Sequence, residues 1–357
     1  MGRRYDMGPG EIRALLEGEP PFRARQVWHG LYRRLEDPAD LTDLPATLRS
    51  RLAALEDLGP ALRPLREAAA DDGATTKWLF GLDDGAEVET VLMRYPDRVT
   101  ACVSSQAGCA MGCTFCATGQ GGFRRHLGVG EIVEQVVRAA RAARESSSQR
   151  RLSNVVFMGM GEPLANLGSV EPALRRLLVD IGLSARHVTV STVGLVPGIH
   201  RLADARLGIG LAVSLHAAND GLRDELVPIN RRWPLAVLEE ACQHWLEAGG
   251  RRISLEWACM DGVNDRQRDA VELAGLAGRL RAHVNLIPLN PTPGWPVQGS
   301  PPERVTAFAA TLAGSGVAVS VRQNRGGTID AACGQLAMRS APRGLPARRG
   351  LAPARIV

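Results

Sequence analysis

The chain has 357 residues, of which 45% are hydrophobic and 23% charged, with a formal net charge of +5 and an isoelectric point near 9.0. These fractions are typical of globular proteins and argue against a disordered chain, a coiled coil or a fibre. The N-terminus lacks the apolar stretch of a secretory signal, and no apolar run approaches the roughly 20 residues of a membrane span, so we expect a cytoplasmic protein without a membrane partner.

The N-terminal part of the chain has helical periodicity. Within residues 22–32, apolar positions recur at helical spacing between arginines. We therefore predict a helical accessory domain over residues 1–74. Its positive and negative charges nearly balance, so the pattern does not indicate a basic patch.

The next segment changes to a period of two. Alternating apolar residues flank an Asp-Asp-Gly turn at residues 83–85, a strong hairpin signal. This pattern predicts a β-hairpin extension over residues 75–94. The alternation places Glu89 on the same strand face as Val91 and Met93.

From residue 99 onward, short apolar strands alternate with helix-length amphipathic segments. Such repeated βα units predict an α/β fold with a parallel sheet, and six or seven of them over residues 95–338 favour a partial (β/α)6-type barrel over an open doubly wound sheet. The last segment, 339–357, contains five arginines and no acidic residue, and we expect a flexible basic tail. The predicted strands are 99–104, 154–158, 187–191, 209–215, 252–257, 283–288 and 317–322. The predicted helices are 131–140, 170–179, 235–248, 265–282 and 302–314.

Most of the chemically suggestive motifs follow one of these strands. In parallel α/β folds, ligands bind at the carboxyl ends of the strands. We therefore expect the motifs to converge on one rim of the sheet. They are the cysteines at 102, 109, 113 and 116, the segment 159–163, residues 191–192, 214–216 and 290–294, and the segments 325–327 and 331–336.

The three cysteines Cys109, Cys113 and Cys116 form the strongest single motif. Their spacing lets three thiolates of one loop face a single centre. Structural zinc takes four ligands, so zinc would also need His126 or Cys102. A [4Fe–4S] cluster on three thiolates keeps one iron open to a small ligand. The spacing favours the cluster, and zinc is the alternative.

At this point the sequence resembles a known family. The run Cys109-Ala-Met-Gly-Cys113-Thr-Phe-Cys116 is similar to the radical S-adenosylmethionine (SAM) signature. Its surroundings resemble the RlmN/Cfr family of RNA adenine methyltransferases, from about residue 22 to residue 336. The family motifs present are Val-Ser-Ser-Gln-Ala-Gly-Cys at 103–109, Met-Gly-Met-Gly-Glu-Pro-Leu at 158–164, Ser-Leu-His at 214–216 and Ala-Ala-Cys-Gly-Gln-Leu at 331–336.

The resemblance implies a radical SAM barrel and a relay that uses two SAM molecules. Cys333 would accept a methyl group from the first SAM and become S-methylcysteine. The cluster on the three-cysteine motif would cleave a second SAM reductively to a radical that activates this methyl group. After the carbon has been joined to the adenine, Cys102 would attack the sulfur of Cys333, release the product and leave a disulfide that external thiols reduce. Glu89 matches the family's proton acceptor, and Cys102 is the competing candidate for that proton.

The SAM contacts also follow from the resemblance. Gly161 would let the backbone approach SAM closely. Polar contacts to the amino group, ribose and adenine would come from five other positions, and Leu215 would line the site. These five are Glu162, Ser191, Ser214, His216 and Asn290.

The implied substrate is an adenine of 23S rRNA, methylated at C2, with tRNA next to the anticodon as a second candidate. The implied partners are a flavodoxin- or ferredoxin-type electron donor and a thiol reductant, and we expect a monomer. A Cfr-like C8 methyltransferase is the nearest alternative, because its motifs would look much the same. Residues 327–328 are Gly-Thr where the resemblance leads us to expect an acidic residue, which leaves the C8 alternative open. An alternative of another class is a zinc-stabilised RNA-binding protein without catalysis.

Two compositional details remain. Cys242 and Cys259 match no motif, and we expect both to be small buried hydrophobic residues. Of the 43 basic residues, only Lys77 is a lysine. A codon bias toward arginine accounts for most of this excess.

Overall fold

The computed structural model describes residues 3–145, 150–290, 292, 295–322, 329–330 and 335. The predicted methyl acceptor Cys333 and the predicted tail over 339–357 lie outside the described residues. Among the helices of the described part, none combines the length and the apolar composition of a membrane span.

The N-terminal part is helical as predicted, but the prediction is wrong for its last segment. Arg63–Ala70 forms strand β1, which pairs antiparallel with β2 (Thr75–Gly81). Most side chains of β1 are exposed, so its sequence does not alternate between apolar and polar residues as a half-buried strand does. Hydrogen bonding to β2 determines its conformation. The helices are α1 (Pro9–Ala14), α2 (Phe22–His29) and α3 (Ala46–Ala53), with shorter turns at Gly30–Arg34, Pro38–Asp40 and Glu56–Leu58.

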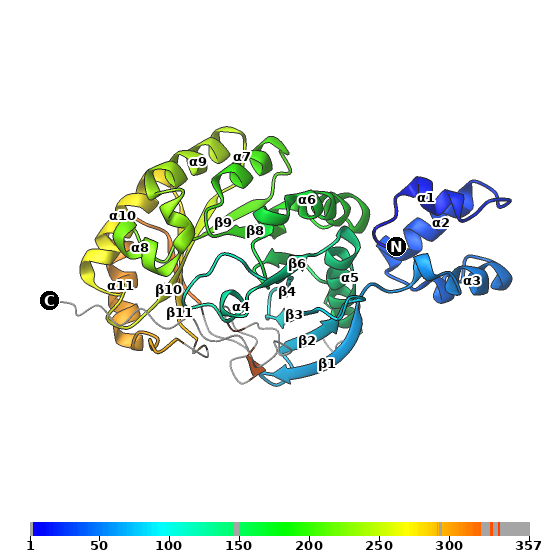
Figure 1. The fold of residues 1–357 in the computed structure, drawn as a ribbon, viewed down its shortest axis with the longest axis horizontal. Helices are drawn as coiled ribbons and strands as arrows, with labels where there is room; N and C mark the ends of the chain where they lie inside the picture. Colours follow the sequence, from blue (N-terminus) through cyan, green and yellow to red (C-terminus); the bar gives the residue numbers. More distant parts are fainter. Residues whose placement is uncertain are drawn as a thin grey trace.

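These N-terminal helices lie at one end of the molecule (Figure 1). The indole of Trp28 donates a hydrogen bond to Asp180 Oδ1 at 3.0 Å. The guanidinium of Arg33 donates to the carbonyls of Val179 and Ile181 at 2.7 and 3.3 Å. These contacts join the N-terminal helices to the turn Arg176–Ile181 that follows α6 (Leu167–Arg175).

The predicted β-hairpin is confirmed. Strand β2 pairs antiparallel with β3 (Glu87–Arg94), and Leu79 lies opposite Glu89. Gly85 adopts a φ of +77° in the connecting turn, a conformation that glycine adopts without strain. Strand β3 also pairs antiparallel with β4 (Val99–Cys102), which joins the hairpin to the rest of the sheet.

The seven strands predicted after residue 95 are all present and run parallel to one another. Their order in the sheet is their order in the chain, so the sheet winds in one direction and curves, with helices around its outside (Figure 1). Within the described residues β1 and β12 are the two edges, so the predicted partial barrel is confirmed. After β4 come β7 (Asn154–Phe157), β8 (Val188–Thr192), β9 (Gly210–Ser214), β10 (Ile253–Cys259), β11 (His283–Pro288) and β12 (Val319–Val321).

The five helices predicted in this region are present, and the structure adds shorter ones. The predicted helices correspond to α5 (Val129–Glu145), α6, α9 (Leu235–Glu247), α10 (Gln267–Leu280) and α11 (Pro302–Gly314). The additional elements are α4 (Ala117–Gln120), α7 (Val196–Asp204), α8 (Asp220–Leu226), the short strands β5 (Gln106–Gly108) and β6 (Phe123–His126), and turns at Pro163–Asn166, Ala185–His187 and Pro228–Arg231.

The two faces of the curved sheet differ in chemistry. On β10, Trp257 points outward, and its ring lies 5.7 Å from that of Phe308 on α11. The alternate residue Glu256 therefore points inward. On β3, the hydroxyl of Thr90 donates to Gln135 of α5 at 2.8 Å, so Glu89 also faces inward. The outer face thus packs against the helices, whereas the inner face carries polar residues.

Candidate active site

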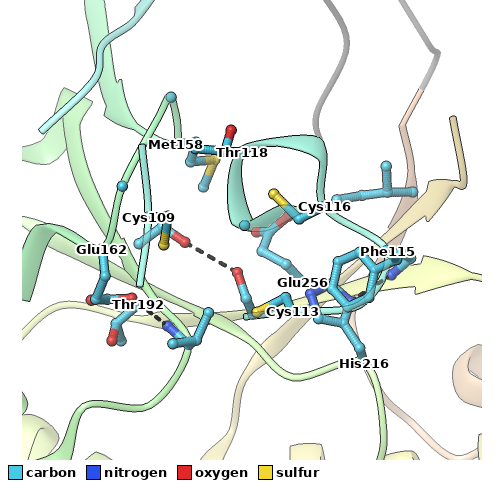
Figure 2. A pocket seen from close by; sticks show the side chains of 18 of the residues that line it. Cys109, Cys113, Phe115, Cys116, Thr118, Met158, Glu162, Thr192, His216 and Glu256 are labelled. Carbon is cyan, nitrogen blue, oxygen red and sulfur yellow. Dashed lines mark hydrogen bonds between the residues drawn. The ribbon is translucent and has the colours of Figure 1, made fainter. Parts of the chain in front are cut away.

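A cavity with about 1070 Å³ of empty space lies at the carboxyl ends of strands β7 to β11. Figure 2 shows Cys109, Glu162 and Thr192 toward one side of it and Phe115 and His216 toward the other, with Cys113 between them. Among the described residues, the motifs after β5, β7, β8, β9 and β11 converge on one rim, as predicted from the strand order. The predicted residues that line the cavity are Cys109, Cys113, Cys116, Gly161, Glu162, Ser191, Ser214, His216 and Asn290.

The three cysteines lie in the loop between β5 and α4. A β-hairpin pins the start of this loop, because the Cys109 N–H donates to the Gly122 carbonyl at 2.9 Å. Gly108 has a φ of +80°, and a Cβ there would lie 2.0 Å from the Gly122 oxygen. Only glycine fits that position, so the local sequence directs the first cysteine of the motif into the cavity.

The thiols are shielded from solvent. Cys113 is buried, and Cys109 and Cys116 are partly buried. Burial raises the pKa of Cys109 to about 12, and burial together with repulsion from the other two thiolates raises that of Cys113. Thiolates are stable here only beside a positively charged group such as metal ions.

This donor set fits a [4Fe–4S] cluster. Three thiols from one loop face one cavity, which matches a cluster with one iron left for a small ligand. A single zinc ion would instead draw its sulfur ligands to about 2.3 Å from one point. His126, the expected additional zinc ligand, lies outside the cavity lining, with Nδ1 3.0 Å from the amide nitrogen of Gln106.

Gly161 is required for a different reason from the one expected. Its φ is +96°, and a Cβ there would lie 2.4 Å from the Cβ of Gln106. The glycine therefore makes room for Gln106, whose Oε1 accepts the N–H of Glu162 at 2.8 Å. Sequence reasoning did not assign a role to Gln106, although it lies within the family motif at 103–109.

Glu162 connects the ends of two neighbouring strands. Its carboxylate follows β7 and accepts the N–H of Leu164 at 3.0 Å and that of Val193, after β8, at 2.9 Å. Burial raises the pKa of Glu162 to about 7. The two oxygens have further lone pairs, so the carboxylate can still accept hydrogen bonds from a ligand in the cavity.

His216 has a defined tautomer. Its backbone has a φ of +60°, and its Nδ1 accepts the N–H of Ala258 at 3.0 Å. Burial, and to a lesser extent the charge of Arg223, lowers the pKa of His216 to about 3. The ring is therefore neutral and carries its proton on Nε2, which makes Nε2 a hydrogen-bond donor. The ring of Phe115 packs against it at a centroid distance of 4.5 Å.

We expect His216→Gln to reduce the acid sensitivity of folding. The unfolded histidine gains a proton below its ordinary pKa of 6.5, whereas the folded one stays neutral down to about 3. The contribution of His216 to stability is therefore present above pH 6.5 and lost as the pH falls toward 3. Between pH 7 and 4.5, the free energy of unfolding should fall by about 2 kcal/mol less in the variant than in the parent.

Urea denaturation at a series of pH values measures this difference. The matched control is His29→Gln, which changes an exposed histidine in α2. Parallel stability curves for His216→Gln and the parent between pH 7 and 4.5 would contradict the assignment of a neutral buried ring.

Arg223 is a buried residue of the site that sequence reasoning missed. Its side chain is fully buried and donates to the carbonyls of Leu215 at 3.2 Å and Val193 at 2.8 Å, and to Asn230 Oδ1 at 2.7 Å. It therefore ties together the loops after β8 and β9, which carry two walls of the cavity. Nothing in the sequence distinguishes it from the other arginines.

Leu215 does not line the cavity, which corrects the expectation from the resemblance. Its side chain is 1% exposed and belongs to the hydrophobic core. It lies against Leu238 and Cys242 of helix α9. The alternation of side chains along the extended segment explains this, because its neighbours Ser214 and His216 face the cavity.

We expect Arg223→Met to lower the free energy of unfolding by about 3 kcal/mol, because it leaves two buried carbonyl groups without their donor. Chemical denaturation of the cofactor-free protein measures the loss. Arg231→Met, at an exposed position in the turn Pro228–Arg231, is the matched control and should change stability by less than about 0.5 kcal/mol. A loss for Arg223→Met no larger than for the control would show that the buried hydrogen bonds contribute nothing net.

Two predicted residues lie outside this cavity but on the same inner face of the sheet. Val91 lies opposite Cys102 in the register of β3 and β4, so Cys102 faces inward together with Glu89. Glu89 is 3% exposed and lines a second, smaller cavity beside Ile329 and Asp330. These residues lie close in sequence to Cys333, which is outside the described residues.

The main cavity contains one further carboxyl group that the sequence did not single out. Glu256 on β10 lines it and accepts a hydrogen bond from the side-chain amide of Asn285 at 2.7 Å. Burial raises its pKa. Its signal in the sequence is weak, because a polar residue in a strand usually points to solvent.

Comparisons with known proteins agree with this geometry. Residues 103–274 match the Radical SAM superfamily. The chain is 56% identical to the probable dual-specificity RNA methyltransferase RlmN of Frankia alni, over 92% of this chain and 81% of that protein. It is 52% identical to the protein of the same description from Thermobifida fusca, over 93% of each chain. The crystal structure of a radical SAM methyltransferase from Sphaerobacter thermophilus superimposes with a TM-score of 0.89 at 49% identity, covering 94% of this chain and 99% of that one. The chain therefore belongs to the RlmN family of radical SAM RNA methyltransferases.

Proposed function

We propose that this protein methylates C2 of an adenine in 23S rRNA, with tRNA next to the anticodon as a second substrate. The observation that carries the proposal is the convergence of three thiols, Glu162 and His216 on one cavity, with Glu89 and Cys102 on the same inner face. The relatives described as dual-specificity RNA methyltransferases support two RNA substrates.

The chemistry of the target requires an unusual route. C2 of adenine lies between two ring nitrogens and is a poor nucleophile, so it does not displace a methyl group from SAM directly. A [4Fe–4S] cluster with SAM, held by Cys109, Cys113 and Cys116, supplies when bound the one-electron chemistry that such a carbon needs. The protein's part is to place the reacting groups on one face.

The remaining steps belong to cysteine chemistry. In this proposal the Cys333 thiolate attacks the methyl carbon of one SAM molecule, S-adenosylhomocysteine leaves, and the residue becomes S-methylcysteine. After the methyl carbon has been joined to the adenine, the Cys102 thiolate attacks the sulfur of Cys333 and a disulfide forms. The bond between that sulfur and the carbon breaks, and the carbon keeps the electron pair and takes up a proton to become the methyl group of the product. A thiol reductant then restores both thiols. Glu89 and Cys102 are the two candidates for accepting the ring proton.

The cavity residues have separate roles toward SAM in this proposal. Glu162 accepts hydrogen bonds from the amino group, because its carboxylate is held in place by two backbone N–H groups. The Nε2 proton of His216 is a donor in a fixed orientation. Ser191, Ser214 and Asn290 complete the polar wall. The protein acts as a cytoplasmic monomer and takes electrons from a flavodoxin- or ferredoxin-type donor.

The decisive experiment is nucleoside mass spectrometry of RNA from a host that lacks its own enzyme and expresses this chain. We expect 2-methyladenosine in 23S rRNA, and in tRNA if both substrates are used. Appearance of 8-methyladenosine instead would establish the Cfr-like alternative. Absence of both products, with the protein soluble and loaded with iron, would overturn the proposed reaction.

A further inference from the structure

Lys77 is the only lysine among the 43 basic residues of the chain. A codon bias toward arginine favours arginine at every basic position. The single lysine therefore indicates a position where an ammonium group is required in place of a guanidinium. Lys77 is also buried, at 8% exposure, which is uncommon for this residue type. Both observations call for a specific partner.

That partner is Glu89. Lys77 on β2 lies opposite Val91 on β3 in the register, so its side chain shares the inner face of the sheet with Glu89. The Lys77 Nζ lies 2.9 Å from Glu89 Oε1, and both side chains are less than a tenth exposed. The same Nζ donates to the carbonyl of Asp330 at 3.0 Å. The pair is thereby held against a segment that begins three residues before Cys333.

Two other charged residues line the cavity at Glu89. Besides Glu89, its lining consists of Arg66 and Ala68 of β1, Lys77 and Leu79 of β2, and Ile329 and Asp330. Cys102 of β4 shares the face from the other side, and the guanidinium of Arg322 lies 3.8 Å from the sulfur of Met93 on the same face. Among these lining groups, Lys77 forms an ion pair with the Glu89 carboxylate.

Lysine suits this position better than arginine. Its ammonium is a compact charge with three donors, which can serve a carboxylate and a carbonyl at once. Arginine presents a wide planar fork that would occupy the space in front of the carboxylate. A buried carboxylate without a counter-charge would be strongly destabilised. Lys77 therefore meets a need that depends on its size as well as its charge.

We propose that Lys77 is a positioning residue for proton transfer, holding the Glu89 carboxylate charged and directed into the cavity that Ile329 and Asp330 line, where the substrate adenine would bind. This inference rests on the proposed function. In the step concerned, the C2–H bond of the adenine joined to Cys333 breaks, its electron pair stays on the ring and the proton moves to the Glu89 carboxylate. Lys77 keeps its own protons throughout.

The test compares Lys77→Met, Lys77→Arg and Glu89→Gln with the parent enzyme, reconstituted with cluster and SAM. Methylation of Cys333 is measured by mass spectrometry of its peptide, and RNA methylation is measured with adenine carrying hydrogen or deuterium at C2. We expect Lys77→Met to methylate Cys333 within about twofold of the parent, but to slow RNA methylation at least about tenfold and increase the deuterium isotope effect, as Glu89→Gln does. The acidic limb of its pH–rate profile should move up by about one unit, because the carboxylate loses its counter-charge. Lys77→Arg should restore part of the rate.

Several outcomes would overturn the inference. An equal loss of Cys333 methylation and RNA methylation would make Lys77 an anchor of the 329–330 segment alone. Unchanged RNA methylation and isotope effect would show that the pair plays no part in the reaction. Arg63→Met, which removes an exposed charge from β1, is the matched control, and thermal unfolding verifies that each variant is folded. A parent enzyme that makes no methyladenosine would refute the proposed function itself, and the inference with it.

Discussion

Cys113→Ala is expected to yield a folded protein that binds little iron and forms no detectable methyladenosine. Cys113 is the central cysteine of the motif and is buried in the wall of the cavity, so its thiolate has no substitute nearby. Without the cluster the reaction reverts to the uncatalysed rate, a loss of at least about 10⁶-fold. Iron and sulfide analysis after anaerobic purification measures the first effect, and nucleoside mass spectrometry measures the second.

The matched control is Cys259→Ala. Cys259 is also a fully buried free cysteine, at the end of β10, but it faces away from the cavity, so the variant should keep its iron. Metal analysis of the parent protein distinguishes a radical SAM enzyme from a zinc-stabilised RNA-binding protein. A colourless protein with one equivalent of zinc and no iron would refute the enzyme and favour the zinc-stabilised RNA-binding alternative.

Cys102→Ala is expected to trap a covalent adduct between the protein and its RNA, linked through Cys333. Cys102 is the proposed thiol that attacks the sulfur of Cys333, so without it the last bond is not broken. Turnover should stop after the first equivalent of RNA. Denaturing gel electrophoresis detects the adduct, and mass spectrometry of the digested complex locates the link.

Cys242→Ala is the control for this experiment. Cys242 is a buried cysteine of α9 on the outer face of the sheet, and its loss should leave turnover intact. Free RNA and an unmodified Cys333 after incubation of Cys102→Ala with SAM and reductant would contradict the relay. An adduct that forms with Cys242→Ala but not with Cys102→Ala would assign the resolving role to another residue.

Local patterns in the sequence were sufficient for much of the fold. The seven parallel strands and the hairpin were predicted because each has a period or an apolar run of its own, bounded by turn residues. Strand β1 was predicted as helix because it is an exposed edge strand, and its backbone pairing with β2 leaves no mark on its side-chain pattern. Helix α8 was missed because its seven residues are too few for periodicity to detect. Helix α7 was also missed, although it is as long as α6.

The sequence by itself determined the three-cysteine motif, the position of the motifs at the ends of strands, and the strand face that Glu89 shares with Val91 and Met93, because spacing and strand alternation are local properties. Only the tertiary structure decided which groups meet across the sheet. It brings Lys77 and Glu89 together as an ion pair and places the side chain of Leu215 in the hydrophobic core. It also places Arg223 between the loops after β8 and β9. These contacts depend on register and on the curvature of the sheet, which arise from the packing of the whole chain and from no single segment.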